Sequence, residues 1–264
     1  MVGNVIFNNK SIHYKREGNG KPIVLLHGFL ESLEMWDNFT KTLSKGFTVI
    51  RIDLPGFGNS ESISNINTME LMADTVNAVM DQEQIKSAVI VGHSMGGYTA
   101  MAFADKFPDK LKGLCLFHSH AAADSEEAKT NRERTIEIVE QNHVGFISNF
   151  ISDLFAPTNI QKFKLEIDLL KTQALKTSME GVVSALKGMK SRTGKFDLLE
   201  KTNVPVLFIA GKKDKRIPAD TIMQQALLPH HSEVLLLENV GHMGYIEAKK
   251  ETLESLRCFV NKCY

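Results

Sequence analysis

Ser94 is the residue whose type and position best suit nucleophilic chemistry. It lies in the segment Gly92-His93-Ser94-Met95-Gly96, between an apolar run at residues 88–91 and a helical stretch at 95–106. A sharp strand-to-helix turn strains the serine backbone, and glycine two positions before and after it removes clashes that bulkier residues would make. The turn lifts the hydroxyl to the positive end of the next helix. We therefore expect Ser94 to be a nucleophile, the alternative being an ordinary glycine-rich turn.

Asp214 and His242 are the expected acid and base. Asp214 follows a predicted strand at residues 205–210, and His242 follows the last predicted strand, at 233–237. Side chains at the carboxyl ends of parallel strands face the same crevice, and the order serine, acid, histidine is the one that this kind of turn requires. His242 would take the Ser94 proton as general base and return it as general acid, while Asp214 would fix the imidazole tautomer.

Other histidines and acids compete for these roles. His93 adjoins the nucleophile but is expected to point away from its face, and His118 and His120 are expected at the mouth of a pocket. Asp124, just past the strand at residues 111–117, is the alternative acid, because the rule for chain order does not fix the strand. Asp214 is preferred to Asp124.

Two backbone amides are candidates for an oxyanion hole, which must hold the negative oxygen of a tetrahedral intermediate. Met95 supplies one, as the residue after the nucleophile, and Phe29 supplies the other from the loop after the strand at residues 23–26. Gly28 lets the backbone approach closely. His27 is expected to brace this loop rather than to transfer protons.

Short apolar runs alternate with helical stretches along most of the chain. Continuous apolar runs are typical of parallel strands buried on both faces, and strand–helix alternation implies an α/β fold with a doubly wound, mostly parallel sheet. Strands are predicted at residues 23–26, 47–52, 88–91, 111–117, 205–210 and 233–237, and helices at 32–44, 68–84, 95–106, 219–228 and 245–260. Residues 2–16, with Asn8-Asn9 at their centre, predict an antiparallel hairpin at the sheet edge.

The alternation stops in the middle of the chain. Residues 121–192 contain no convincing strand and carry many charged residues, with apolar positions at helical spacing. We interpret this region as an inserted helical lid. The core then consists of residues 1–120 and 193–264.

Charge and composition exclude several functions. The chain has 31 Lys and Arg, 31 Asp and Glu, and a net charge of +0, and without a basic cluster no nucleic-acid partner is expected. No targeting segment and no run of about 20 apolar residues stands out, so no membrane span is expected. Cys115, Cys258 and Cys263 lack a CxxC spacing and predict reduced thiols in a cytoplasmic protein. The histidine spacing predicts no metal, and no cofactor is expected.

Several motifs together resemble the α/β-hydrolase superfamily across nearly the whole chain. The resemblance implies the α/β-hydrolase fold with an inserted lid, and the stretch at residues 185–192 looks like the lid exit of lidded serine esterases and enol-lactonases. In relatives the loop at residues 53–60 braces the pocket, which implies a structural Asp53. The motifs are Leu26-His27-Gly28-Phe29, residues 53–60 (DLPGFGNS), residues 92–97 (GHSMGG), residues 211–214 (GKKD) and Gly241-His242.

The resemblance also narrows the reaction. Relatives that open epoxides or remove halides use an aspartate nucleophile, whereas this chain has Ser94. Hydrolysis of a carboxylic ester, thioester or lactone through an acyl-enzyme is therefore favoured. Carbon–carbon bond hydrolases and cofactor-free perhydrolases of this superfamily use the same triad and stay open as alternatives. The expected partner is a small ester-type molecule; the sequence defines neither its identity nor the oligomeric state.

The predicted pocket is mostly apolar, which suggests a small to medium acyl group that is uncharged or weakly polar. For Leu186 and Met189, packing of the lid on the sheet is an equal alternative. The predicted lining residues are Phe29, Leu30, Trp36, Met95, His118, Phe155, Leu186 and Met189.

A ligand-binding protein with the hydrolase fold and little turnover is the competing class of function, because fold alone does not determine activity. The set of Ser94, Asp214 and His242 favours an enzyme, since a pure scaffold would not need all three.

Overall fold

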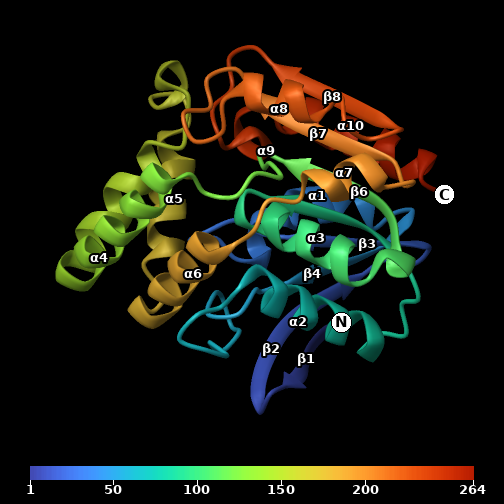
Figure 1. Ribbon diagram of the computed structural model, residues 1–264, viewed down its shortest axis with the longest axis horizontal. Helices are drawn as coiled ribbons and strands as arrows, with labels where there is room; N and C mark the ends of the chain where they lie inside the picture. Colours follow the sequence, from blue (N-terminus) through green and yellow to red (C-terminus); the bar gives the residue numbers. More distant parts are fainter.

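An eight-stranded sheet runs through the computed structural model, which describes residues 1–264 (Figure 1). Its strands are β1 (Val2–Phe7), β2 (Lys10–Glu17), β3 (Lys21–Leu26), β4 (Phe47–Ile52), β5 (Ala88–His93), β6 (Leu111–Phe117), β7 (Val206–Gly211) and β8 (Ser232–Leu237). The order across the sheet is β1-β2-β4-β3-β5-β6-β7-β8, with every pair from β4 to β8 parallel. This confirms the predicted mostly parallel sheet.

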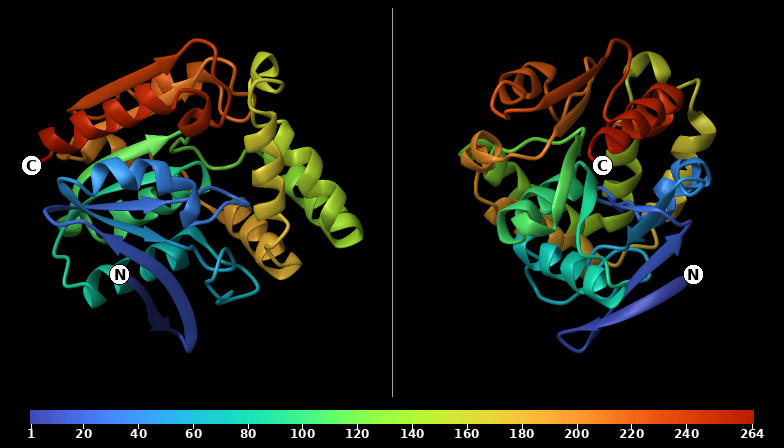
Figure 2. Two further views of the ribbon diagram at one scale, coloured as in Figure 1. Left: turned by 180° about the vertical axis from the view of Figure 1, so that it is seen from behind. Right: turned by 90° about the vertical axis from the view of Figure 1, so that its right-hand side faces the viewer.

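Helices cover both faces of the sheet. Figure 2 shows α2 and α3 on one face and α1 and α10 on the other. None of the helices combines the length and the apolar character needed to cross a membrane. The core elements are η1 (Leu33–Trp36), α1 (Asp37–Leu43), α2 (Met69–Gln82), α3 (Met95–Lys106), η2 (Pro108–Lys110), α7 (Phe196–Lys201), α8 (Ala219–Gln225), α9 (Gly244–Glu247) and α10 (Lys249–Lys262).

The β1–β2 hairpin forms one edge of the sheet, as predicted. Asn8 and Asn9 have φ values of 49° and 60°, the left-handed backbone that a tight two-residue hairpin turn requires. Asparagine tolerates this conformation better than most residues. The register pairs Phe7 with Lys10 across the turn.

Two helical predictions needed correction, and one helix was not predicted. The helix expected at residues 32–44 is a 3-10 turn followed by α1, and the helix expected at 245–260 divides into α9 and α10 at Ala248, whose φ is −138°. Helix α7 was not predicted, because six residues are too few to show a helical period.

Three of the four helices between β6 and β7 lie over the carboxyl ends of the strands. They are α4 (Glu126–Ser152), α5 (Lys164–Ala174) and α6 (Met179–Ser191), with a short 3-10 turn, η3 (Pro157–Asn159); we call them the helical cover (Figure 1). Ser125 and Ser178 cap α4 and α6 by accepting backbone N–H bonds. Helix α4 is kinked at Asn142. The cover falls inside residues 121–192, the region predicted to be a lid.

Helix α6 is tied closely to the core. A Cβ added at Gly181 would lie 2.1 Å from the carbonyl oxygen of Gly56, so the two backbones approach as only glycine allows. Asn67 Nδ2 donates a hydrogen bond to Ser184 Oγ at 3.0 Å. This end of the cover is therefore fixed against the loop after β4.

Candidate active site

Ser94 lies at the turn between β5 and α3 with an unusual backbone. Its φ is 49° and its ψ is −114°, a conformation that is strained for a residue with a side chain. A Cβ at Gly92 would lie 2.1 Å from the carbonyl oxygen of Gly96, and a Cβ at Gly96 would lie 2.6 Å from that of His27. Both glycines are thus required by close backbone contacts. The turn brings Ser94 to the wall of a large cavity.

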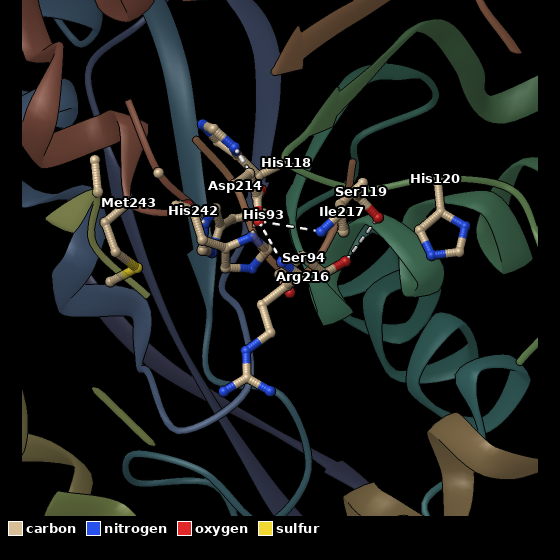
Figure 3. A network of polar contacts seen from close by, with 12 residues as sticks. His93, Ser94, His118, Ser119, His120, Asp214, Arg216, Ile217, His242 and Met243 are labelled. Atoms are coloured by element: carbon tan, nitrogen blue, oxygen red, sulfur yellow. Dashed lines mark hydrogen bonds and ion pairs between the residues drawn. The ribbon is translucent and has the colours of Figure 1, made fainter. Parts of the chain in front are cut away.

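Asp214, in the loop after β7, holds the imidazole of His242. His242 Nδ1 lies 2.7 Å from Asp214 Oδ2, while the backbone N–H groups of Arg216 and Ile217 donate to Oδ1 at 2.8 and 3.0 Å (Figure 3). Burial opposes ionisation of Asp214, but the charge on His242 and the hydrogen bonds from His118 and His242 outweigh it and hold its pKa well below the usual range. The carboxylate is therefore ionised and saturated with donors.

His118 is a second histidine on Asp214. Its Nδ1 lies 3.1 Å from the same Oδ2 that His242 contacts, and the side chain is fully buried. Burial lowers the pKa of His118 to about 4, with the hydrogen bond to Asp214 opposing the shift. His118 is thus neutral at pH 7, and because a carboxylate only accepts hydrogen bonds, Nδ1 carries the proton.

The prediction that His118 lies at the pocket mouth was wrong. Its φ is 48°, which turns the side chain into the protein, toward Asp214. Its Nε2 has no hydrogen-bond partner, and a Cβ on Gly244 would lie 2.3 Å from it. Neither the left-handed backbone nor this close fit has a signal in the sequence.

A buried hydrogen-bond network that the sequence did not predict holds the backbone of His242. His93 Nδ1 lies 2.8 Å from Glu31 Oε2, and His93 Nε2 lies 3.0 Å from the carbonyl oxygen of His242. Tyr245 and the Gly28 amide also donate to Glu31, both at 2.8 Å. Burial disfavours both charges, yet their attraction keeps the pKa of Glu31 below and the pKa of His93 above its ordinary value. His93 thus braces the loop of His242, away from the cavity chemistry.

The loop after β3 contains the Phe29 amide, the proposed second oxyanion donor. His27 is fully buried; its Nδ1 lies 2.7 Å from the carbonyl oxygen of Gly28, and its Nε2 accepts from the Leu54 amide at 2.9 Å. Desolvation lowers the pKa of His27, as expected for a neutral bracing residue. Phe29 itself lines the cavity.

The cavity has a volume of about 860 Å³ and lies between the strand ends and the helical cover. Ser94, His242, Phe29, Leu186 and Met189 all line it. The prediction was wrong for Leu30, Trp36, Met95 and Phe155, which do not line the cavity, are at most 2% exposed and belong to the hydrophobic core.

Asp124, the alternative acid, contacts arginines. Both Arg132 and Arg192 form ion pairs with its carboxylate, the latter at 2.6 Å. Burial opposes its ionisation, but Arg132 and Arg192 hold its pKa below the usual range. Asp53 accepts backbone N–H bonds from Leu33 and Asn59 at 2.8 and 3.0 Å, which is a loop-bracing role.

The two histidines and Asp214 also form a cluster of possible metal ligands, within 4.8 Å of one another. The two Nδ1 atoms lie at hydrogen-bond distances from one carboxylate oxygen. Protons on both nitrogens account for this geometry, whereas ligation would require both to be deprotonated.

Known proteins share this architecture. A family model described as the alpha/beta hydrolase fold matches residues 21–249. A thermophilic esterase from Thermogutta terrifontis, solved with malate bound, superposes with a TM-score of 0.94 and 31% identity, covering 100% of this chain and 99% of that chain. A 2-hydroxy-6-oxononadienedioate/2-hydroxy-6-oxononatrienedioate hydrolase from Pseudomonas putida is 28% identical over 90% of this chain and 87% of that relative.

A further relative is the dihydrolipoyllysine-residue acetyltransferase component of an acetoin cleaving system from Pseudomonas putida, 30% identical over 92% of this chain. This chain spans only 64% of its length. The matched family segment contains the strand-end loops that carry Ser94, Asp214 and His242. From this match and from the sheet that carries it, the chain belongs to the α/β-hydrolase fold family.

Proposed function

We propose that the protein is a serine hydrolase that cleaves a carboxylic ester, thioester or lactone through an acyl-enzyme on Ser94. The observation that carries this proposal is the 2.7 Å contact between Asp214 Oδ2 and His242 Nδ1, in the same cavity as the strained Ser94. Similarity to the esterase from Thermogutta terrifontis supports it.

In the first half of the reaction His242 acts as general base. Because Asp214 accepts the proton on Nδ1, the other ring nitrogen, Nε2, is the one free to take the proton from Ser94 Oγ. The serine oxygen then attacks the carbonyl carbon and a tetrahedral oxyanion forms. The ionised Asp214 stabilises the imidazolium that results.

The amides of Phe29 and Met95 bind the oxyanion in this proposal. Met95 is the first residue of α3, so its N–H lies at the positive end of the helix. The Phe29 amide has no acceptor within the protein and belongs to a loop held by His27 and Glu31. Donors fixed before the reaction stabilise the transition state without reorganising.

The second half of the reaction releases the acyl group. Protonated His242 gives its proton to the leaving group as the tetrahedral intermediate collapses. The same residue then deprotonates a water molecule, which attacks the acyl-enzyme and frees Ser94.

Residues 121–192 act as the lid in this proposal, with residues 1–120 and 193–264 as the core. The kink of α4 at Asn142 and the position of the helical cover over the strand ends support this role. Lids of this kind exclude water from the reacting atoms.

Hydrolysis of a carbon–carbon bond is the second candidate. The dioate hydrolase from Pseudomonas putida, 28% identical to this chain, is named for a substrate with keto and carboxylate groups but no ester. A ketone could occupy the same site, with the serine and the oxyanion donors in the same positions.

A parallel screen tests the proposal. Esters, thioesters, lactones and vinylogous diketones are offered to the wild type and to Ser94→Ala. Turnover of an acyl compound that Ser94→Ala abolishes is the expected result. Turnover of the diketones alone would favour the second candidate. Binding without turnover of any compound would favour a ligand-binding protein.

A further inference from the structure

Arg216 is a cationic side chain on the cavity wall without an acidic partner. Its backbone N–H is fixed by Asp214 at 2.8 Å, and its side chain lines the cavity together with Ser94 and His242. Figure 3 shows the guanidinium directed away from Asp214, and it makes no hydrogen bond or ion pair within the protein.

The other arginines near the cavity differ from Arg216. Arg132 contacts both carboxylate oxygens of Asp124, and Arg192 forms an ion pair with the same residue at 2.6 Å. Their charges are thus neutralised by the protein. The donors of Arg216 are accessible from the cavity, so a ligand can use them.

An aromatic ring holds the guanidinium in place. Arg216 Cζ lies 4.5 Å from the ring centroid of Phe150, in α4, a stacking arrangement that arginine favours. Phe150 packs edge-on against Phe29 at 5.6 Å. The ring of Phe150 therefore lies between the Arg216 guanidinium and Phe29, whose amide is the proposed oxyanion donor.

Unpaired positive charges on the cavity wall favour the binding of an anionic ligand. Lys215 also lines the cavity without an ion pair, and Asp153 is the one lining acid that has no paired cation. Crowding by protein atoms lowers the pKa of Arg216, with Asp153 and Asp214 opposing the shift; a guanidinium stays charged at neutral pH. The charged lining residues are Glu31 (paired with His93), Asp124 (paired with arginines), Arg132, Asp153, Lys215 and Arg216.

We propose that Arg216 is a specificity-determining residue that binds a carboxylate on the substrate, so that the natural substrate carries a negative charge in its acyl part or its leaving part. This rests on the proposed function. The planar guanidinium presents paired N–H donors that match the two oxygens of a carboxylate. This proposal replaces the expectation of an uncharged or weakly polar acyl group, which relied in part on four apolar residues that the structure places in the core.

Isosteric esters test the proposal. Phenyl hemisuccinate is compared with phenyl 4-methylpentanoate, in which an isopropyl group replaces the carboxylate of the acyl part. Acetoxybenzoate with its carboxylate in the para position is compared with 4-isopropylphenyl acetate, which tests the leaving part. The readout is the ratio of kcat/KM for the anionic ester to that for its neutral isostere, which cancels losses common to both.

Two variants that should change this ratio in opposite directions are compared with the wild type. Arg216→Gln should lower the ratio by about 10- to 100-fold for at least one pair of esters, the range expected for a charged hydrogen-bonded contact. Asp153→Asn removes a competing carboxylate and should raise that ratio about threefold. Lys213→Gln, an exposed change in the same loop away from the cavity, is the matched control.

An unchanged ratio in Arg216→Gln for both pairs of esters would overturn the proposal. If the wild type hydrolyses no ester, thioester or lactone, the proposed function fails, and binding tests the subsite separately. Titration calorimetry then compares succinamate with 4-methylpentanamide on Ser94→Ala and on the Ser94→Ala, Arg216→Gln double variant. Tighter binding of succinamate that depends on Arg216 supports the subsite, and equal affinities contradict it.

Discussion

The loops at the carboxyl ends of β5, β7 and β8 hold their polar side chains through buried hydrogen bonds, whereas the helical cover meets the cavity with side chains that have few partners. Asp214 accepts four such bonds, from two imidazoles and two amides. Across the cavity, Leu186 and Met189 contribute apolar surface. The reacting groups are therefore preorganised by the strand-end loops. Side chains of the helical cover that face the cavity can change without disturbing those groups.

Removal of the acid at the strand ends should have the largest effect. Asp214→Asn changes the partner of His242 Nδ1 and favours the wrong tautomer, so we expect kcat to fall about 10⁴-fold. Asp124→Asn, on the other side of the cavity, should keep kcat within about tenfold, although it leaves Arg132 and Arg192 without their ion-pair partner. Steady-state kinetics on both variants check this, and the reverse pattern would make Asp124 the acid.

The stability of the strand-end region should depend on pH. The folded-state pKa of His118 is lowered from 6.5 to about 4, so between these values the unfolded chain binds more protons. His118 should therefore contribute a fall of on the order of 3 kcal/mol in the free energy of unfolding as the pH drops from 6.5 to 4. His93, whose pKa is raised, acts oppositely, adding stability as pH falls toward 6.5.

Urea unfolding at pH 7, 6, 5 and 4 measures this dependence. His118→Asn removes the titrating ring and keeps a residue that tolerates positive φ, so its stability should vary less over the window. His231→Asn, an exposed change just before β8, serves as the control. An equal change in the free energy of unfolding with pH for the wild type and His118→Asn would contradict the assignment of a neutral buried His118.

Loss of the second imidazole should alter catalysis moderately. His118→Leu removes one donor from Asp214, which then stabilises protonated His242 more strongly. We expect kcat/KM to fall about tenfold and the acid limb of its pH profile to move to higher pH. His118→Asn offers an amide donor near the Nδ1 position and should recover most of the activity. A lower rate with an unmoved acid limb would mean that His118 is only structural.

The helical cover should affect substrate choice rather than chemistry. Leu186→Ala enlarges the cavity, so the preference for hexanoate over acetate esters should rise about fivefold in kcat/KM, since one methylene is worth about 1–3 kcal/mol in a hydrophobic site. Val182→Ala, buried in the same helix but away from the cavity, is the control. Equal changes in both variants would show a general loosening of α6.

The sheet was predictable because its strands are buried on both faces. The predicted run at residues 47–52 coincides with β4 (Phe47–Ile52), and the run at 111–117 with β6 (Leu111–Phe117). The positions of Asp214 and His242 after successive strands likewise predict that the two side chains meet, as they do at 2.7 Å. Parallel strands bring such loops together whatever the rest of the sequence is.

The surroundings of these residues were not predictable in the same way. The contact between His118 and Asp214 depends on a φ of 48° at a non-glycine residue, which no local pattern reveals. Trp36 and Phe155 were expected in the pocket as part of a mostly apolar lining, yet apolar residues pack into cores more often than they line cavities. Arg216 reaches the cavity because its long side chain leaves the loop that Asp214 fixes.

Covalent labelling tests directly whether Ser94 is the nucleophile. The wild type is treated with a fluorophosphonate, and the modified peptide is identified by mass spectrometry, with Ser94→Ala and the neighbouring Ser119→Ala treated alongside. We expect one adduct per chain on Ser94 in the wild type and in Ser119→Ala, and none in Ser94→Ala. A folded wild type that stays unlabelled, or an adduct on another residue, would contradict the assignment of Ser94 as the nucleophile.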